Sequence, residues 1–193
     1  MNTGFYSEDE LKEIGFEKIG KNVLISKKAS IYGSERMTIG NNVRIDDYCI
    51  LSGRINIGNY VHIAVFSAIF GGSEGIVFKD FSGVSSRCGI YATTDDYSGE
   101  FMTNPTVPSE YTNIISKRVV IGRHVDIGTG STVLPGVEIG DGCAFGAMTL
   151  VSKSTKPWGF YMGYQCVRIK ERSDRILELE EKLMKGLPAV LTE

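Results

Sequence analysis

The chain has 193 residues, of which 42% are hydrophobic and 23% charged, and its formal net charge is −2. These values are ordinary for a globular protein and exclude the broad basic surface with which many proteins bind nucleic acids. The acidic N-terminus does not resemble a signal peptide, and no apolar run reaches the roughly 20 residues of a membrane-spanning helix. We therefore expect a cytoplasmic protein that does not insert into a membrane.

A short helix is the first predicted element, within residues 1–18. Ser7 and Glu10 have the spacing of a capping box, and Gly15 is a typical helix stop. Near the other end of the chain, the charged and amphipathic stretch 171–186 predicts a C-terminal helix that ends at Gly186 and Pro188.

Between these helices, an apolar residue recurs at every sixth position. A helix repeats its apolar face near every 3.6 residues and a strand at every second residue, so neither explains a period of six. Three such positions make one turn of a triangular prism. The repeat therefore predicts about six coils of short parallel strands, stacked about 4.8 Å apart. The positions are Ile19, Ile25, Ile31, Ile39, Ile45, Leu51, Ile57, Ile63, Ile69, Phe78, Val84, Ile90, Ile121, Ile127, Val133, Ile139, Phe145 and Val151.

The fourth residue after each apolar one is expected to point inward too, where space is tight. Sixteen of these eighteen residues are Val, Ala, Cys, Ser or Thr. The row explains three of the four cysteines (Cys49, Cys88 and Cys143) as small core residues. All four, with Cys166, are expected to be free thiols, because they lie far apart and form no CxxC pair. The row is Val23, Ala29, Glu35, Val43, Cys49, Ile55, Val61, Ser67, Ser73, Ser82, Cys88, Thr94, Val125, Ser131, Val137, Cys143, Thr149 and Thr155.

The repeat is interrupted three times, always between the third face of one coil and the first face of the next. Two extra residues follow the face at Ile31, three follow the face at Ile69, and 25 follow the face at Ile90. The longest insertion, residues 96–120, carries aromatic residues and prolines and predicts a structured arm. Long ordered excursions from a compact solenoid are usually functional.

The hexads, [LIV]-G-x-x-[small]-x over roughly residues 19–170, resemble the hexapeptide-repeat acyltransferases. The resemblance implies an all-β fold, a left-handed parallel β-helix with short terminal helices. It divides the chain into an N-terminal helical segment (1–18), the β-helix acyltransferase domain (19–156) and a coenzyme-covering segment with a helix (157–193). It also implies a homotrimer with active sites between subunits, in which the arm reaches over the neighbouring subunit.

The tail "IGDGCAFGAMTLVSKSTKPWGFYMGYQCVRIK" is similar to the ending of the maltose and galactoside O-acetyltransferases, which holds coenzyme A. The resemblance implies acetyl-CoA as acyl donor and no required metal. Gln165 and Val167 stand where that branch has a proline and a basic residue. By the same resemblance, four residues line the coenzyme channel and two lie near its phosphates: Thr129, Ala147, Ser152 and Lys153, then Arg168 and Lys170.

Transfer of an acetyl group to an alcohol needs a base for the hydroxyl proton. The branch places a histidine at the end of "I-Y-x-A-T-H", and the matching stretch here is "IYATTDDY", which puts Asp95 at the base position. We interpret His124 as a surface residue. We hypothesise that His62, expected at a coil corner, is the base, oriented by Asp95 or Asp96 across the subunit cleft. The alternatives are that His62 stacks between coils and that the aspartates cap a turn.

The function that the resemblance favours is O-acetylation of a sugar hydroxyl for surface polysaccharide, such as O-antigen or capsule. An alternative is N-acetylation of a nucleotide-linked amino sugar, because an amine loses its proton more readily than a hydroxyl. Tyr97 and Phe101 on the arm suit stacking on either substrate. A third alternative is a non-catalytic assembly subunit. Carbonic anhydrases of this fold need three zinc-binding histidines, and this chain has two histidines in all.

Overall fold

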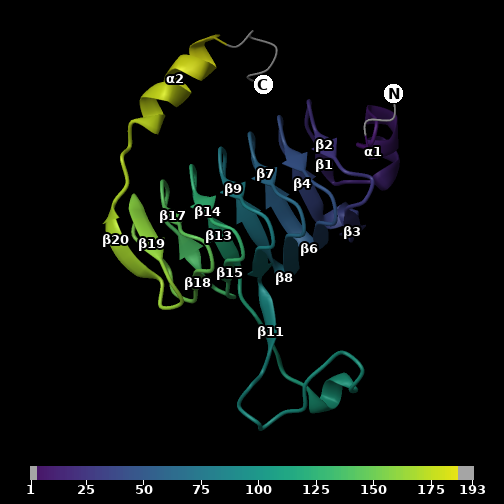
Figure 1. The fold of residues 1–193 in the computed structure, drawn as a ribbon. Coiled ribbons are helices and arrows are strands. Elements are labelled where there is room, and N and C mark those ends of the chain that lie inside the picture. The colour runs from purple at the N-terminus through teal and green to yellow at the C-terminus, as the bar shows by residue number, and fades with distance from the viewer. Residues whose placement is uncertain (1–3, 187–193) are drawn as a thin grey trace.

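The six-residue repeat folds into a β-solenoid of about seven turns, flanked by a short helix at each end (Figure 1). The computed structural model describes residues 4–186. Helix α1 spans Glu8–Ile14, and helix α2 spans Ile176–Gly186. No helix in this range has the length and hydropathy of a membrane span.

The strands form three faces, and pairing between successive coils is parallel. The first face holds β1 (Lys18–Ile19), β4 (Met37–Ile39), the ends of β6 (Ile50–Ile57) and β8 (Ala68–Phe78), β13 (Val119–Ile121) and β16 (Glu138–Ile139). The second holds β2 (Leu24–Ile25), β5 (Arg44–Ile45), β7 (His62–Ile63), β9 (Gly83–Val84), β14 (Asp126–Ile127), β17 (Ala144–Phe145) and β19 (Gly159–Met162). The third holds β3 (Ser30–Tyr32), the starts of β6 and β8, β10 (Gly89–Tyr91), β15 (Thr132–Val133) and β18 (Leu150–Val151).

The predicted apolar row forms the core. All its members are buried except Ile19 and Ile31, which are partly buried. Those two lie in the first coil, which has a neighbouring coil on one side only. Residues of the row pair with one another in register, as Ile45 does with Ile25 and Ile63. The six coils predicted from the sequence are therefore confirmed, and Thr155, which bridges to Ile139, begins a further turn.

The second inward row is correct except beside the insertions. Glu35 and Ser73 are exposed, and Thr94 lies in the arm, so the prediction that these three point inward was wrong. The inward positions belong instead to Met37, Ile76 and Val119, all at most 1% exposed. Each of these comes two residues before a first-face residue. The inserted residues thus lie between the third face and this inward position. A count of four residues forward from the third face therefore stops within the insertion.

The first corner, between the first and second faces, is held by side-chain oxygens. Asn41 Oδ1 accepts from the backbone N–H of Lys21 (2.7 Å), and Asn59 Oδ1 accepts from that of Asn41 (2.8 Å). Asp80 repeats the bond for Asn59 at 2.7 Å, and Asp141 does so for Arg123 at 2.9 Å. Each corner is therefore hydrogen-bonded to the coil that follows it.

The next residue at the first corner has a positive φ, even where it is aromatic. Tyr60, Phe81 and His124 have φ values of 57°, 59° and 55°. Their rings stack in successive coils, at centroid distances of 4.7 Å for Tyr60–Phe81 and 5.1 Å for Phe81–His124. His124 is 8% exposed, so our interpretation of it as a surface residue was wrong. The hexad count could not show that Phe81 stacks on its ring and that Glu180 of α2 contacts its Nε2.

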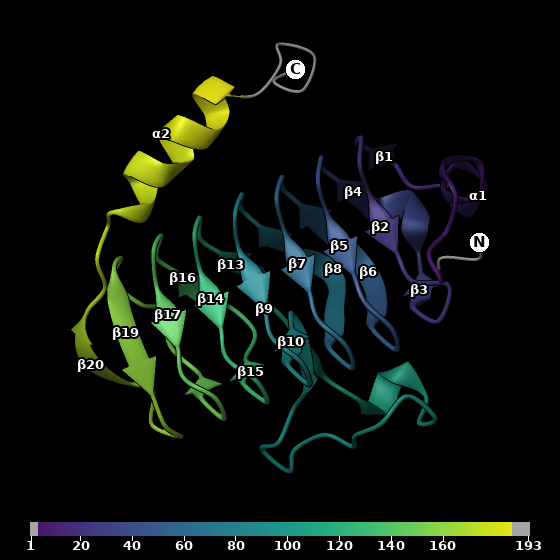
Figure 2. The same cartoon turned by 45° about the horizontal axis from the view of Figure 1, so that its top comes forward.

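The longest insertion forms an arm at the third corner, and it projects from the solenoid in both views (Figures 1 and 2). Two antiparallel strands, β11 (Thr93–Asp95) and β12 (Ile114–Ser116), close its base. At its far end Ser109–Tyr111 forms a 3₁₀ turn, as Ser34–Arg36 does in the two-residue insertion.

Both terminal helices were predicted, with one difference in extent. The capping box of Ser7 and Glu10 is present, and Gly15 ends α1 in the left-handed conformation. At the C-terminus, β20 (Val167–Glu171) pairs antiparallel with β19, and the helix begins at Ile176 rather than at Glu171, so the predicted start was wrong. Pro188 lies outside the described residues.

We predict that Ile76→Ala lowers the free energy of unfolding by about 2–5 kcal/mol, because it removes a fully buried side chain. Ser73→Ala should change it by less than about 0.5 kcal/mol, because Ser73 is exposed. Urea unfolding of both variants measures the difference. Equal losses would show that the inward position at this insertion is assigned incorrectly.

Candidate functional site

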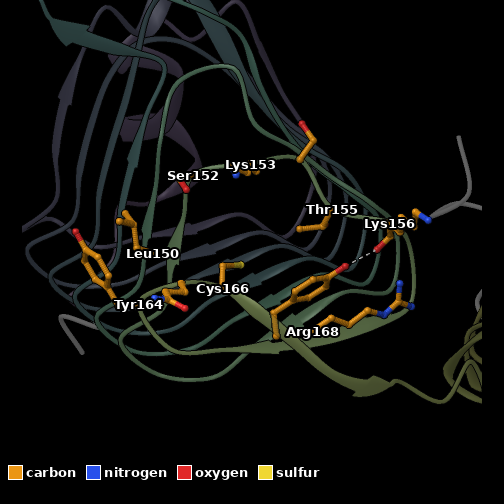
Figure 3. A pocket seen from close by; sticks show the side chains of 11 residues that line it. Leu150, Ser152, Lys153, Thr155, Lys156, Tyr164, Cys166 and Arg168 are labelled. Carbon is orange, nitrogen blue, oxygen red and sulfur yellow. Dashed lines mark hydrogen bonds between the residues drawn. The ribbon is translucent and has the colours of Figure 1, made fainter. Parts of the chain in front are cut away.

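The last coil and the β19–β20 hairpin enclose a pocket of about 680 Å³ (Figure 3). Ser152 and Lys153 come from the coil, and Arg168 comes from the hairpin that crosses it. Figure 3 shows Lys156 with Arg168 at one end of the pocket. Leu150 and Tyr164 lie at the other end. The pocket therefore has a cationic end and a more apolar end.

Arg168 is held by the hairpin and still has donor capacity. Its guanidinium lies 5.9 Å from the ring centroid of Tyr161, and Nη2 donates to Pro157 O (3.2 Å) and Glu171 Oε2 (2.6 Å). The buried Nε of Arg168 has no hydrogen-bond partner within residues 4–186. Together with Lys153, Lys156 and several hydroxyl groups, this donor set fits an anionic ligand such as a phosphate.

Three of the six predicted coenzyme residues (Ser152, Lys153 and Arg168) line this pocket, and Lys170 does not. A register shift between Phe160 and Tyr161 places Arg168 opposite Tyr161 and Lys170 opposite Phe160. Lys170 Nζ lies 5.6 Å from the Phe160 ring and borders a separate pocket of about 240 Å³. The two cations predicted to bind the same phosphates thus line different pockets.

Thr129 and Ala147, the other two, lie in successive coils at the second corner, between the second and third faces. The backbone N–H of Met148, which follows Ala147, donates to Thr129 O at 2.8 Å. Neither residue is among those that line the large pocket.

Sequence reasoning missed Lys156, Tyr164 and Cys166 as pocket residues. The basic stretch "SKSTK" was a usable signal for Lys156, whereas Tyr164 and Cys166 reach the pocket only through the turn of the hairpin. Burial, and to a lesser degree the neighbouring Cys143, raises the pKa of the Cys166 thiol. Cys166 is therefore a poor candidate for a nucleophile.

His62 lies in strand β7, not at a corner as expected, and its side chain is about half exposed. Its Nε2 lies 2.8 Å from Asp46 Oδ2, and Arg44 Nε donates to Asp46 Oδ1 at 2.7 Å. Burial alone would raise the pKa of Asp46, but the hydrogen bonds from Arg44 and His62 outweigh it and lower that pKa. The sequence signal for this cluster is that Arg44 and His62 occupy equivalent positions in successive coils. Parallel pairing therefore places them side by side.

The two arm aspartates differ in their surroundings. Asp96 Oδ1 accepts from the backbone N–H of Ser98 and Oδ2 accepts from Asn113 Nδ2, both at 2.7 Å. These bonds, led by those to Ser98, hold the pKa of Asp96 below its usual value. Asp95 pairs with Ile114 through the backbone, and its carboxylate has no hydrogen-bond or ion-pair partner in the described part of the chain. The turn interpretation therefore fits Asp96, whereas Asp95 is available.

A single chain does not bring His62 and Asp95 together. His62 lies on the second face, between the first and second corners, and the arm leaves from the third corner. On the arm, Tyr97 is 84% exposed and Phe101 is 42% exposed. Within residues 4–186, no three His, Cys, Asp or Glu side chains gather as metal ligands.

Comparison with known proteins gives relatives that span almost the whole chain. A dTDP-4-amino-4,6-dideoxy-D-glucose acyltransferase from Escherichia coli is 48% identical over 179 residues, 91% of this chain and 93% of that protein. AntD, an N-acyltransferase from Bacillus cereus solved with dTDP and 3-hydroxybutyryl-CoA, is 50% identical with a TM-score of 0.93. The match covers 95% of this chain and 97% of AntD. No protein-family model matches the chain.

Other AntD structures are of variants in which one serine or one aspartate is replaced. A serine variant was solved with dTDP-4-amino-4,6-dideoxyglucose and coenzyme A. A more distant relative is WbbJ of E. coli K12, a candidate O-acetyl transferase of lipopolysaccharide biosynthesis. It is 29% identical over 67% of this chain and 66% of its own length.

We predict that Asp46→Asn lowers the free energy of unfolding at pH 7 by about 1 kcal/mol, because it weakens a hydrogen-bonded ion pair. The folded-state pKa of Asp46 is depressed, so its stabilisation is complete above the ordinary carboxyl pKa, near 4, and is lost as the pH falls through the lowered pKa. The difference between wild type and variant should therefore shrink as the pH falls below about 4 in urea titrations. Asp126→Asn, on the same face, serves as the control. A difference that does not depend on pH would contradict the assignment.

Proposed function

The chain belongs to the hexapeptide-repeat acyltransferases, and from this premise we propose that it transfers an acyl group from coenzyme A to the amino group of a nucleotide-linked amino sugar. The observation that carries the proposal is the near full-length relation to the E. coli dideoxyglucose acyltransferase. It favours N-acylation, the alternative interpretation of the sequence, over O-acetylation of a sugar hydroxyl. The acceptor that fits best is a dTDP-linked 4-amino-4,6-dideoxy sugar.

The pocket under the β19–β20 hairpin is the proposed site for the phosphate-bearing end of acyl-CoA. Lys153, Lys156 and Arg168 supply positive charge there. The coenzyme contributes the acyl group as a thioester. Thr129 and Ala147, along the second corner, would line the path of its extended arm.

We assign the base to Asp95. Once the amine nitrogen bonds to the carbonyl carbon, its remaining protons become acidic, so a carboxylate is a sufficient acceptor for one of them. Asp95 has a free carboxylate, whereas Asp96 uses both oxygens within the arm. The existence of AntD variants at one aspartate is compatible with this role. His62 remains the alternative base, with Asp46 rather than an arm aspartate as its orienting partner.

The proposed assembly is a homotrimer with active sites between subunits. The projecting arm, with exposed Tyr97 and Phe101, would reach over a neighbouring solenoid, and Asp95, in the strand at its base, would face the cleft between the two subunits (Figure 2). This arrangement would unite groups that one chain keeps apart. The proposed acceptor and the relation to WbbJ support a role in surface-polysaccharide synthesis. A cytoplasmic location stays a prediction.

We expect the protein to release coenzyme A from acetyl-CoA or 3-hydroxybutyryl-CoA when given a dTDP-linked 4-amino-4,6-dideoxy sugar. The corresponding 4-hydroxy sugar should not support turnover. A thiol-release assay with mass detection of the product measures both. Turnover on the hydroxyl sugar alone would overturn the proposal in favour of O-acylation.

The choice of base makes a second prediction in the same assay. Asp95→Asn should lower kcat by about 10²–10⁴-fold, the usual contribution of a general base, without changing the melting temperature. Asp96→Asn should lose less than tenfold, because an amide oxygen can still accept one of the arm hydrogen bonds. If His62→Ala abolishes turnover and Asp95→Asn does not, His62 is the base.

For the coenzyme site, Arg168→Ala should weaken coenzyme A binding by roughly 10-fold or more, since it removes a charge-assisted donor. Lys170→Ala should weaken it by less than about threefold, because Lys170 lies outside the pocket. Calorimetric titration with coenzyme A separates the two. Equal effects would mean that the phosphates contact Lys170 as well as Arg168, and that the coenzyme site is not confined to this pocket.

A further inference from the structure

The segment after β20, residues 172–186, is attached to the solenoid at few points; we call it the C-terminal strap. Figures 1 and 2 show its helix α2 running back along the solenoid from the last coil, beside the first corner. No residue of α2 is buried, and Leu177, Leu179 and Leu183 are all at least 40% exposed. Hydrophobic packing therefore does not fix the helix within the described chain.

Arg172 makes the first attachment. Its Nη1 donates to three backbone oxygens: His124 O at 2.7 Å, Cys143 O at 3.1 Å and Gly142 O at 3.2 Å. Its backbone N–H donates to Trp158 O at 2.8 Å. One residue thus joins the strap to three successive turns at the first corner.

Glu180 makes the second attachment, from the middle of α2. Its Oε2 lies 2.6 Å from His124 Nε2, and its Oε1 contacts the guanidinium of Arg123. The side chains of His124 and Glu180 are 9% and 11% exposed, so this contact is largely shielded from water. Burial, followed by Arg123 and Arg172, lowers the pKa of His124. The imidazole Nε2 and the Glu180 carboxylate are thus hydrogen-bonded in a site largely closed to water.

These attachments lie next to the pocket. Arg172 directly follows Glu171, whose Oε2 accepts from Arg168 Nη2 at 2.6 Å. Strand β20 is the last strand of its sheet and has β19 as its strand neighbour on one side only. The far end of β20 is thus held by the strap, and the near end carries Arg168.

We infer that Glu180 is a positioning residue for the coenzyme pocket: by fixing α2 to Arg123 and His124, it holds β20 and Arg168 in place. The inference rests on the proposed function, since it takes this pocket as the coenzyme site. Glu180 acts through the strap and contacts neither substrate. It therefore governs affinity for acyl-CoA and leaves the chemical step unchanged.

The test compares Glu180→Ala, Glu180→Gln and Glu181→Ala in the full-length protein. Glu180→Ala should raise the Kd for coenzyme A roughly three- to tenfold by calorimetry and raise KM for acyl-CoA alike, with kcat within twofold. Amide hydrogen exchange in residues 167–172 should speed up. Glu180→Gln keeps an acceptor for His124 and should recover part of the affinity. Glu181 pairs with Lys185 on the exposed side of α2, so Glu181→Ala is the matched control.

The outcomes separate this inference from the proposed function. If Glu180→Ala speeds exchange in α2 but leaves residues 167–172 and the Kd unchanged, the strap is only a structural appendage and the inference is wrong. A fall in kcat at unchanged Kd would also overturn it. If the wild-type protein binds no coenzyme A, the proposed function fails first and the positioning role fails with it.

Discussion

The structure depends on one constraint: each residue of a coil lies about 4.8 Å from its equivalent in the next coil. Inward positions must then hold residues whose volumes fit from coil to coil, and corner residues must repeat the same backbone turn. Side-chain oxygens such as those of Asn41, Asn59 and Asp80 lock the first corner. The third corner, where every insertion lies, has one such bond in the described chain, from the backbone N–H of Glu138 to Ser154 Oγ.

Stacking also explains why strained backbone is tolerated. A non-glycine residue in the left-handed conformation costs about 1–2 kcal/mol. Tyr60, Phe81 and His124 adopt it in successive coils, and so do Tyr48 and Phe66 at the second corner, whose rings stack at 5.2 Å. Stacked aromatic pairs return about 0.5–1.5 kcal/mol beyond their buried area. The strain at each corner is thus offset by contact with the same corner of the next coil.

The sequence predicted the fold well because the repeat is local and every coil restates it. The prediction of inward-pointing residues failed at Glu35, Ser73 and Thr94. Each was found by counting forward across an insertion, whereas the inward position there is fixed relative to the following face. The site was predicted less completely. Ser152, Lys153 and Arg168 share a pocket as expected, but a single register shift moves Lys170 away from Arg168. The partners of His62 and His124, Asp46 and Glu180, are tertiary contacts between coils or with the helix, and no hexad position encodes them.

The antiparallel turn of the last hairpin has a consequence for the molecule as a whole. A parallel solenoid ends in an open strand edge that would accept the first coil of another molecule, and such edges lead to fibres. Strand β20 reverses the chain direction and presents Arg168, Lys170 and Glu171 along that edge. The same hairpin roofs the pocket. Adding or deleting one 18-residue repeat in the middle of the chain would therefore carry the cap and pocket along together, but it would change their distance from the arm. In the proposed site, the number of coils between the arm and the last hairpin therefore sets the distance between Asp95 and the coenzyme pocket.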